Sequence, residues 1–209
     1  MSKEGLMCVV SGFSGSGKGT IMEELTKRYD NYAVSISATT RNPRDGETEG
    51  VSYFYKTKDE FEKLIAENAL YEYNNYQGNY YGTLRSYVDE LRREGKDVIC
   101  EIDVNGAMHI REQFPDTVLV FVTPPSAEEL KKRLVGRGTE EKEKINGRLR
   151  QAVEESKYMD RYDHILINDD LDTCVEELNR ILVMEHMRPS RQKDFIESLQ
   201  KDLKNLKLL

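Results

Sequence analysis

Short apolar runs alternate along the chain with longer stretches in which apolar residues recur every three or four positions. The short runs predict buried strands, and the longer spacing predicts helices with one apolar face. The predicted strands are 6–12, 32–37, 97–104, 117–124 and 164–169. The predicted helices are 18–29, 84–94, 105–114, 126–135 and 171–187. This alternation predicts an α/β fold with a parallel sheet covered by helices on both faces.

Two regions depart from this rhythm. Residues 39–82 are rich in Arg, Tyr, Gly and Asn, with strand-like alternation at 51–55 and 70–76 around a short helix that begins near Lys58. This pattern predicts an inserted, partly β subdomain. Residues 136–161 are highly charged and carry little apolar content until their helical end, so we expect a mobile flap there.

The pattern changes again in the tail. Pro189 breaks the preceding helix, and a second amphipathic helix is predicted beyond it. Its apolar positions are Phe195, Ile196, Leu199, Leu203 and Leu206. From Arg188 onward the local net charge is +3 on an otherwise acidic chain. We favour a helix packed on its own domain or on a neighbouring subunit, which leaves a homo-oligomer open; a membrane-surface or partner-binding helix is the alternative.

Composition narrows the class of protein. The chain has 209 residues, 38% hydrophobic and 33% charged, which allows one sizeable domain and is unlike a disordered chain. The net charge of -7 argues against broad nucleic-acid binding, although arginines concentrated locally can still bind an anion. The apolar run at the N-terminus is too short for a signal sequence or a membrane span, so we expect a cytoplasmic protein without a membrane partner. Cys8, Cys100 and Cys174 are expected to be reduced and mostly buried.

The motif that carries chemistry is GFSGSGKGT at 12–20. It matches the phosphate-binding pattern G-x-x-x-x-G-K and lies between a predicted strand and a predicted helix, as that pattern requires. Glycines let backbone N–H groups turn toward phosphate oxygens, the helix N-terminus adds its dipole, and the lysine adds a charge. The residues expected to bind the donor nucleotide here are Gly12, Phe13, Ser14, Gly15, Ser16, Gly17, Lys18, Gly19 and Thr20.

Gly19 stands where this pattern usually has a serine or threonine that ligates Mg²⁺. Because glycine offers no hydroxyl, either Mg²⁺ is held through water and the nucleotide, or Thr20 takes part of that role. We therefore expect no direct protein ligand to the metal, with Asp103 and Thr20 nearby. Loops of the form GSGKGT are typical of nucleoside monophosphate kinases.

Further segments resemble guanylate kinases and occur in that family's order. They are SISATTRNPRDGETEGVSYFY from Ser35, YEYNNYQGNYYGT from Tyr71, CEIDVNGA from Cys100, RLVGRGTE from Arg133 and ILINDDLD from Ile165. The resemblance covers about 6–187 and implies a single P-loop kinase domain. Its implied parts are a parallel core (about 4–36, 83–135 and 158–187), an inserted mixed-β GMP-binding region (about 37–82), a helical lid (about 136–157) and a basic tail helix (about 189–209).

The resemblance also implies which residues bind the phosphate of GMP. They are Arg41, Arg44, Tyr53 and Tyr81. The chemistry agrees, because guanidinium groups can fork onto phosphate oxygens and tyrosines donate hydroxyls from rigid rings.

Guanine carries N1–H and N2–H₂ donors beside an O6 acceptor, so a protein that reads it needs a carboxylate and a hydroxyl. Glu72 matches the family's carboxylate, and Ser37 and Thr83 match its hydroxyls. Glu101 and Asp103 match two acidic positions at the carboxyl end of a strand. It stays open which of these two carboxylates contacts guanine and which contacts metal-bound water.

The lid is expected to supply the remaining positive charge. Arg133, Arg137 and Arg148 align with arginines that close over the donor phosphates, and Asn168 resembles the residue beside adenine. Such a lid stabilises charge on the transferring group and excludes water. The predicted catalytic residues are Lys18, Arg41, Asp103, Arg137 and Arg148.

These residues predict transfer of the γ-phosphoryl group of ATP, with Mg²⁺, to GMP and dGMP. One alternative is a protein-binding scaffold module with decayed catalytic parts, and the retained lysine, arginines and aspartate argue against it. The other is a kinase for AMP or UMP, and the pairing of Ser37 with Glu72 argues for guanine.

Overall fold

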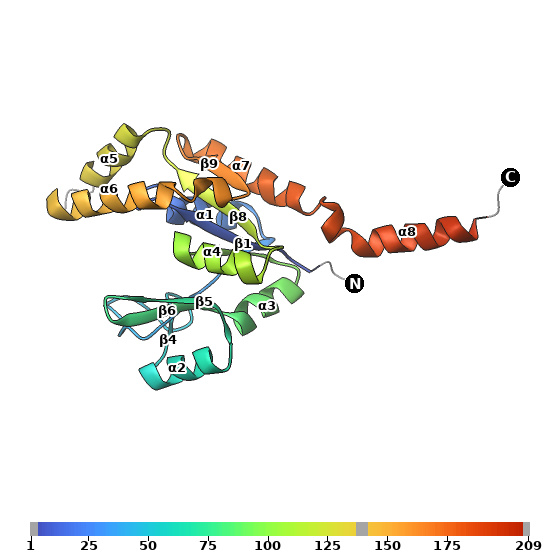
Figure 1. Ribbon diagram of the computed structural model, residues 1–209, viewed down its shortest axis with the longest axis horizontal. Helices are drawn as coiled ribbons and strands as arrows, with labels where there is room; N and C mark the ends of the chain where they lie inside the picture. Colours follow the sequence, from blue (N-terminus) through green and yellow to red (C-terminus); the bar gives the residue numbers. More distant parts are fainter. Residues whose placement is uncertain (1–3, 137–141, 207–209) are drawn as a thin grey trace.

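The computed structural model of the chain describes residues 4–136 and 142–206. Its core is a five-stranded, fully parallel sheet in the order β2-β7-β1-β8-β9 (Figure 1). The strands are β1 (Met7–Gly12), β2 (Tyr32–Val34), β7 (Asp97–Glu101), β8 (Val118–Thr123) and β9 (His164–Ile167). All five predicted core strands are therefore confirmed, although the second ends at Val34 and not at residue 37.

Helices cover both faces of this sheet because the side chains of β1 alternate between two apolar clusters. Met7 and Val9 belong to one cluster, and Cys8 and Val10 belong to the other. The second cluster is closed by α1 (Lys18–Arg28) and α7 (Leu171–Glu185). The first is closed by α3 (Arg85–Arg93), α4 (Val104–Gln113), α5 (Ala127–Gly136) and α6 (Lys142–Ser156).

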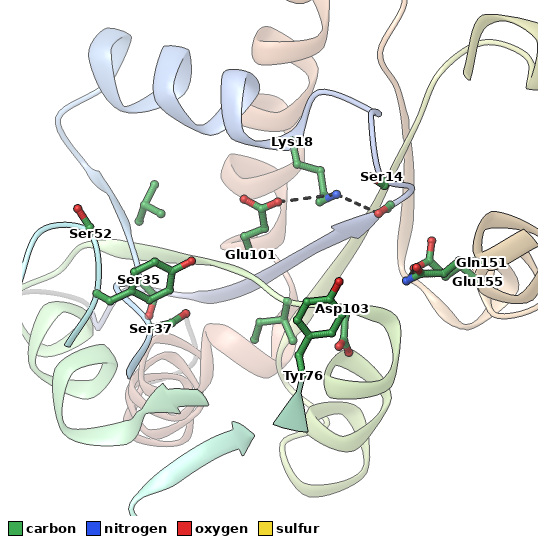
Figure 2. A pocket seen from close by; sticks show the side chains of 14 residues that line it. Ser14, Lys18, Ser35, Ser37, Ser52, Tyr76, Glu101, Asp103, Gln151 and Glu155 are labelled. Carbon is green, nitrogen blue, oxygen red and sulfur yellow. Dashed lines mark hydrogen bonds and ion pairs between the residues drawn. The ribbon is translucent and has the colours of Figure 1, made fainter. Parts of the chain in front are cut away.

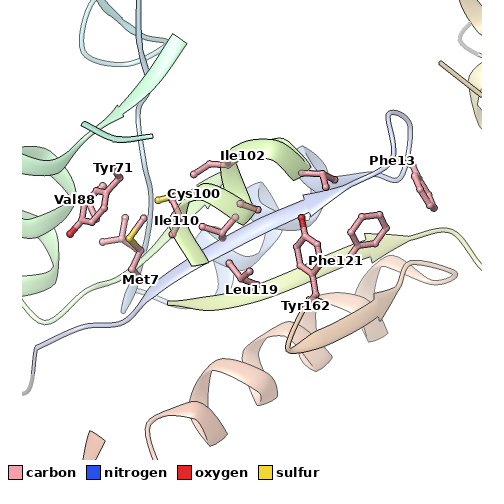
Figure 3. Close-up of a cluster of buried hydrophobic side chains, with 14 of the residues drawn as sticks. Met7, Phe13, Tyr71, Val88, Cys100, Ile102, Ile110, Leu119, Phe121 and Tyr162 are labelled. Atoms are coloured by element: carbon pink, nitrogen blue, oxygen red, sulfur yellow. The ribbon is translucent and has the colours of Figure 1, made fainter. Parts of the chain in front are cut away.

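Aromatic rings fill the first cluster beneath the Gly-rich loop. The ring centroids of Phe13 and Phe121 lie 5.0 Å apart, and those of Phe121 and Tyr162 lie 5.1 Å apart, both edge to face (Figure 3). These contacts anchor the start of the loop on the core. The three cysteines are buried and unpaired, as expected.

A second, smaller sheet lies beside the core on the side of α4 (Figure 1). Its order is β4 (Phe54–Tyr55), β3 (Ala38–Thr39), β6 (Asn79–Leu84) and β5 (Leu70–Tyr76). Only the pair β3 and β4 is parallel, so the predicted mixed-β insertion is confirmed.

The helix α2 (Lys58–Ala66) covers the small sheet. Thr57 and Glu60 form a reciprocal capping box at its first turn, which fixes where the helix begins. Phe61 is fully buried and stacks on the ring of Tyr80 with centroids 5.1 Å apart. The strand predicted at 51–55 reduces to Phe54–Tyr55.

The charged stretch predicted as a flap contains the 15-residue helix α6, followed by the short 3-10 helix η1 (Met159–Arg161). Ala152 is the buried residue of α6, and Ile145 and Leu149 pack on the core cluster beside it. The expected helical lid is thus an amphipathic helix resting on the core by a narrow apolar stripe.

The tail contains the 3-10 helix η2 (Pro189–Arg191) and the helix α8 (Lys193–Asn205), which extends away from the core (Figure 1). No residue of α8 is buried, and Phe195 and Leu203 are 63% and 59% exposed. The expectation that this helix packs on its own domain is therefore wrong, because its apolar face points into solvent. Packing on a neighbouring subunit stays a prediction. Within 4–136 and 142–206, no helix has both the length and the apolar character to cross a membrane.

Candidate functional site: a two-ended nucleotide cavity

The Gly-rich loop connects β1 to α1 and leaves the N-terminus of α1 without a side-chain cap. Gly17 occupies the cap position with φ of +92°, and a Cβ there would lie only 2.4 Å from Nδ2 of Asn168. This amide donates a hydrogen bond of 2.8 Å to the carbonyl oxygen of Ser16. A helix N-terminus without a side-chain cap presents its first backbone N–H groups in the way that phosphate-binding sites use.

The Lys18 ammonium lies over the loop. Its Nζ donates to the carbonyl oxygens of Gly12 at 2.9 Å and Phe13 at 3.3 Å, and it lies 3.7 Å from Oε1 of Glu101 (Figure 2). The lysine therefore stands between the loop and the carboxyl end of β7, where a phosphate would meet both.

A cavity of about 670 Å³ opens in front of this lysine (Figure 2). A smaller cavity of about 250 Å³ adjoins it and reaches the small sheet. The predicted site residues that line one or both cavities are Gly12, Ser14, Lys18, Ser37, Tyr53, Glu72, Tyr81, Glu101 and Asp103. The helix α6 adds Gln151 and Glu155 to the lining of the larger cavity, and the sequence did not single out either residue.

Glu72 lies at the inner end of the smaller cavity and is only 8% exposed. Its Oε1 accepts a hydrogen bond of 2.8 Å from the Thr83 hydroxyl. Burial raises the pKa of Glu72 to about 7, the Thr83 hydrogen bond opposes that rise, and the charge of Asp103 adds to it. The other oxygen lies above α4, where a Cβ on Gly106 would be 3.0 Å from Oε2. Glycine at this position thus makes room for the carboxylate.

Arg41 is held by Glu47, a residue that the sequence did not identify. The guanidinium donates to Oε1 of Glu47 at 2.8 Å, while Oε2 accepts from the Arg44 backbone N–H and the Tyr55 hydroxyl, each at 2.8 Å. These donors lower the pKa of Glu47 to about 2, with the Arg41 hydrogen bond as the largest cause. The guanidinium carbon lies 5.3 Å from the ring centroid of Tyr53. Glu47 could have been found as the acidic residue beside the paired arginines.

Arg44 differs from Arg41 in its surroundings. Its contribution to this cluster is the backbone N–H, and its side chain is exposed. The structure therefore brings Arg41, Tyr53 and Tyr81 together, with Tyr53 and Tyr81 rings 6.1 Å apart, while the guanidinium of Arg44 lies outside that group.

Asp103 lies beyond the end of β7 and caps α4. Its Oδ1 accepts from the Gly106 backbone N–H at 2.8 Å, and its Oδ2 accepts from Nδ2 of Asn74 at 2.8 Å. Glu101 and Asp103 thus both reach the cavity, although a helix cap and not strand alternation orients Asp103.

The predicted donor-side residues meet at the other end of the loop. An N–H of Arg133 donates to the Asn168 carbonyl oxygen at 2.9 Å, and its Nε pairs with Glu129 at 3.0 Å. Arg148 on the lid helix donates to the Ser14 hydroxyl of the loop. Arg137 lies outside the described residues.

Whether the phosphate loop itself can ligate a metal ion depends on Gly19 and Thr20. A Cβ on Gly19 would meet nothing within 4 Å, and Thr20 is exposed. Glu101, Asp103 and Glu155 bring carboxylate oxygens to the large cavity, and oxygens are the ligands that Mg²⁺ prefers. Within 4–136 and 142–206, however, no three Asp, Glu, His or Cys side chains group closely enough to hold a metal ion, so a Mg²⁺ ion here would be bound through water and the nucleotide phosphates.

A parallel sheet with a strand, Gly-rich loop, lysine and helix in sequence defines the class of P-loop kinases. The comparisons name the family within that class: the guanylate kinase family model matches residues 5–185, so the chain belongs to this family.

Relatives and solved structures agree. The chain is 43% identical to a guanylate kinase of Caldanaerobacter subterraneus subsp. tengcongensis over 97% of this chain and 98% of that protein. It is 45% identical to a guanylate kinase of Bacillus subtilis over 91% and 94% of the two chains. The crystal structure of guanylate kinase from Anaplasma phagocytophilum aligns with a TM-score of 0.72 at 29% identity, over 94% of this chain and 96% of that one.

Proposed function

We infer that this chain is a guanylate kinase that transfers the γ-phosphoryl group of ATP to GMP, giving ADP and GDP. One observation carries the assignment: the phosphate loop with Lys18 and the buried pair Glu72 and Thr83 lie at opposite ends of two adjoining cavities. A donor phosphate and a guanine base can therefore be bound in one continuous space.

At the donor end, the loop amides and Lys18 bind the phosphates of ATP, and Asn168 with Arg133 borders the adenine. Arg148 lies on α6 and donates a hydrogen bond to Ser14, and from there its guanidinium contacts the transferring phosphoryl group. Phosphoryl transfer depends mainly on positioning and on stabilising charge, and these groups supply both. We also propose Arg137 as a second arginine of the lid.

At the acceptor end, Arg41, Arg44, Tyr53 and Tyr81 bind the phosphate of GMP. Glu72 must be ionised to accept the N1–H and N2–H₂ donors of guanine, and the hydroxyls of Ser37 and Thr83 complete the reader. Adenine and uracil lack this donor pair, and they would leave a buried carboxylate unpaired at a large free-energy cost.

Mg²⁺ is the proposed metal, and when bound it neutralises charge on the phosphates. Asp103 and Glu101 would hold it through its water ligands, with Thr20 nearby. The division of the chain into core, GMP-binding region, lid and tail belongs to the same proposal. We also propose a cytoplasmic location, which the unpaired cysteines at Cys8, Cys100 and Cys174 support, because free thiols persist in reducing compartments.

A coupled assay of ADP release tests the function. GMP and dGMP should be phosphorylated in the presence of ATP and Mg²⁺, while AMP and UMP should give less than about one hundredth of that rate because the buried carboxylate rejects them. Equal rates with AMP or UMP would contradict the guanine assignment. Absence of turnover with every acceptor would instead favour a protein-binding module.

A further inference from the structure

Asn74 forms a hydrogen bond between the β5–β6 hairpin and the core. Nearer the base of β5, Glu72 approaches α4 at Gly106. Two residues further toward the tip, Nδ2 of Asn74 donates to Oδ2 of Asp103 at 2.8 Å. Asn74 also lines the smaller cavity, between Glu72 and Asp103.

The orientation of this amide follows from the chemistry of its partner. An ionised carboxylate only accepts hydrogen bonds, so the NH₂ group of Asn74 must face Asp103, and its carbonyl oxygen must face away. Both oxygens of Asp103 are then engaged, one by the N-terminus of α4 and one by the small sheet. The carboxylate cannot rotate without breaking one of these bonds.

The neighbouring residue on β5 provides a contrast. Successive side chains of a strand point to opposite faces, so Asn75 points away from the face that carries Asn74. Asn75 is exposed, pairs in register with Tyr80 of β6 and lines neither cavity. The two asparagines thus have the same side chain on the same strand, and only one of them reaches Asp103.

We propose that Asn74 is a positioning residue for GMP: its bond to Asp103 holds the tip of the hairpin against the core, so that Glu72 faces guanine in a fixed arrangement while Asp103 stays in place for the water ligands of Mg²⁺. Three carboxylates, at Glu72, Glu101 and Asp103, line the smaller cavity, and Asn74 supplies a donor among them. Without that donor the hairpin tip loses its tie to Asp103, and GMP must restore the arrangement when it binds. This inference rests on the role proposed above for Asp103.

The test compares Asn74→Ala with Asn75→Ala in the full chain. Asn74→Ala should weaken GMP binding, measured by titration calorimetry and as KM, by about fivefold, because a hydrogen bond to a charged group is lost at an exposed position. The KM for ATP should stay within about twofold, and kcat should fall less than KM rises. Asn75→Ala should leave all three parameters unchanged. Asn74→Asp, which puts a second carboxylate beside Asp103, should weaken GMP binding more than Asn74→Ala does.

A double-mutant cycle separates positioning from general damage. In an Asp103→Ala background, Asn74→Ala should change GMP affinity by less than about twofold, because its partner is already gone. The same fivefold loss in both backgrounds, or equal losses for GMP and ATP, would overturn the inference. If Asp103→Ala itself binds and phosphorylates GMP normally, the role proposed for Asp103 fails. An impaired Asp103→Ala with an inert Asn74→Ala refutes the positioning role alone.

Discussion

The donor and acceptor ends of the cavity differ in how their anion-binding groups are held. At the donor end, most of the proposed groups are backbone amides and one lysine within the contiguous segment 12–20, supported directly by β1 and α1, and Arg148 reaches the loop from α6. At the acceptor end, they come from β6 and from the long connection between β3 and β4. There the main cation, Arg41, is already paired with the carboxylate of Glu47.

Because of this difference, substitutions at the two ends should have different kinetic effects. The donor loop is organised by its own backbone, so a substitution there should remove charge stabilisation from the transition state without disturbing other groups. The acceptor end is organised by side chains that hold one another, so a substitution there should mainly change GMP binding. Predictions at the two ends should therefore separate into effects on kcat and effects on KM.

The largest effect is expected for Lys18→Ala. Removing the ammonium proposed to face the donor phosphates should lower kcat by about 10²–10³-fold, while the fold stays intact because the Lys18 side chain is not part of either apolar cluster of the core. Steady-state kinetics measure the first effect, and circular dichroism with thermal unfolding measures the second. Lys27→Ala is the matched control, since Lys27 lies on the same helix and pairs with Glu23 and Glu24 on the surface. A rate near that of the unmodified enzyme would remove Lys18 from the donor site.

The donor loop was also the part that sequence predicted best. Its motif is contiguous and its context is local, so strand, loop and helix could be located from periodicity and glycine spacing alone. The five core strands followed from apolar runs for the same reason. The short strands β3 and β4 were poorly predicted, because two-residue strands carry no period and depend on their neighbours.

The acceptor end required the family resemblance, because its residues are far apart in the sequence. Even so, Glu47 and Asn74 were missed: an acidic or amide residue in a polar segment looks like solvated surface until its partner is placed beside it. The tail was misjudged for the opposite reason. Helical spacing predicted α8 correctly, yet an apolar stripe does not specify what covers it.

Glu72→Gln should give the next largest effect. Its pH dependence also distinguishes the acceptor end from the donor end. The amide can accept fewer hydrogen bonds from guanine, so kcat/KM for GMP should fall by about 10–100-fold while the KM for ATP stays unchanged. Because the pKa of Glu72 is raised to about 7, kcat/KM for GMP in the unmodified enzyme should rise with pH up to about 7 and then level off. The variant should lose that rise. Equal losses for both nucleotides would refute Glu72 as the guanine reader.

The same raised pKa has an opposite effect on stability. A carboxyl group whose pKa is higher in the folded than in the unfolded protein destabilises the fold as pH rises. For Glu72 this loss of stability develops between its ordinary pKa of 4.5 and about 7. At pH 8, Glu72→Gln should therefore be more stable than the unmodified chain, by on the order of 2–3 kcal/mol in free energy of unfolding. At pH 4, where both forms are neutral, the difference should vanish. Denaturant unfolding at the two pH values measures this, and a loss of stability at pH 8 would show that the buried charge is compensated.

Of the substitutions at Lys18, Glu72 and Glu47, the smallest effect is expected for Glu47→Gln. It tests whether the ion pair between Arg41 and Glu47 holds the phosphate-binding residues in place or blocks them. A neutral amide cannot hold Arg41 while also accepting from the Arg44 N–H and the Tyr55 hydroxyl. The phosphate-binding connection should loosen, raising the KM for GMP about tenfold and changing kcat by less than about twofold.

Asp45→Asn provides the control for Glu47→Gln, since Asp45 is an exposed carboxylate in the same connection and it also loses one negative charge near the GMP phosphate. If the loss of charge alone mattered, both variants would bind GMP more tightly, because each removes repulsion from the phosphate. A lower KM for GMP in Glu47→Gln but not in Asp45→Asn would mean that Glu47 competes with the phosphate for Arg41. The phosphate-binding site at the acceptor end would then be blocked by the Glu47 side chain. The two ends would differ in whether a carboxylate occupies the anion site, and not in how the anion-binding groups are held.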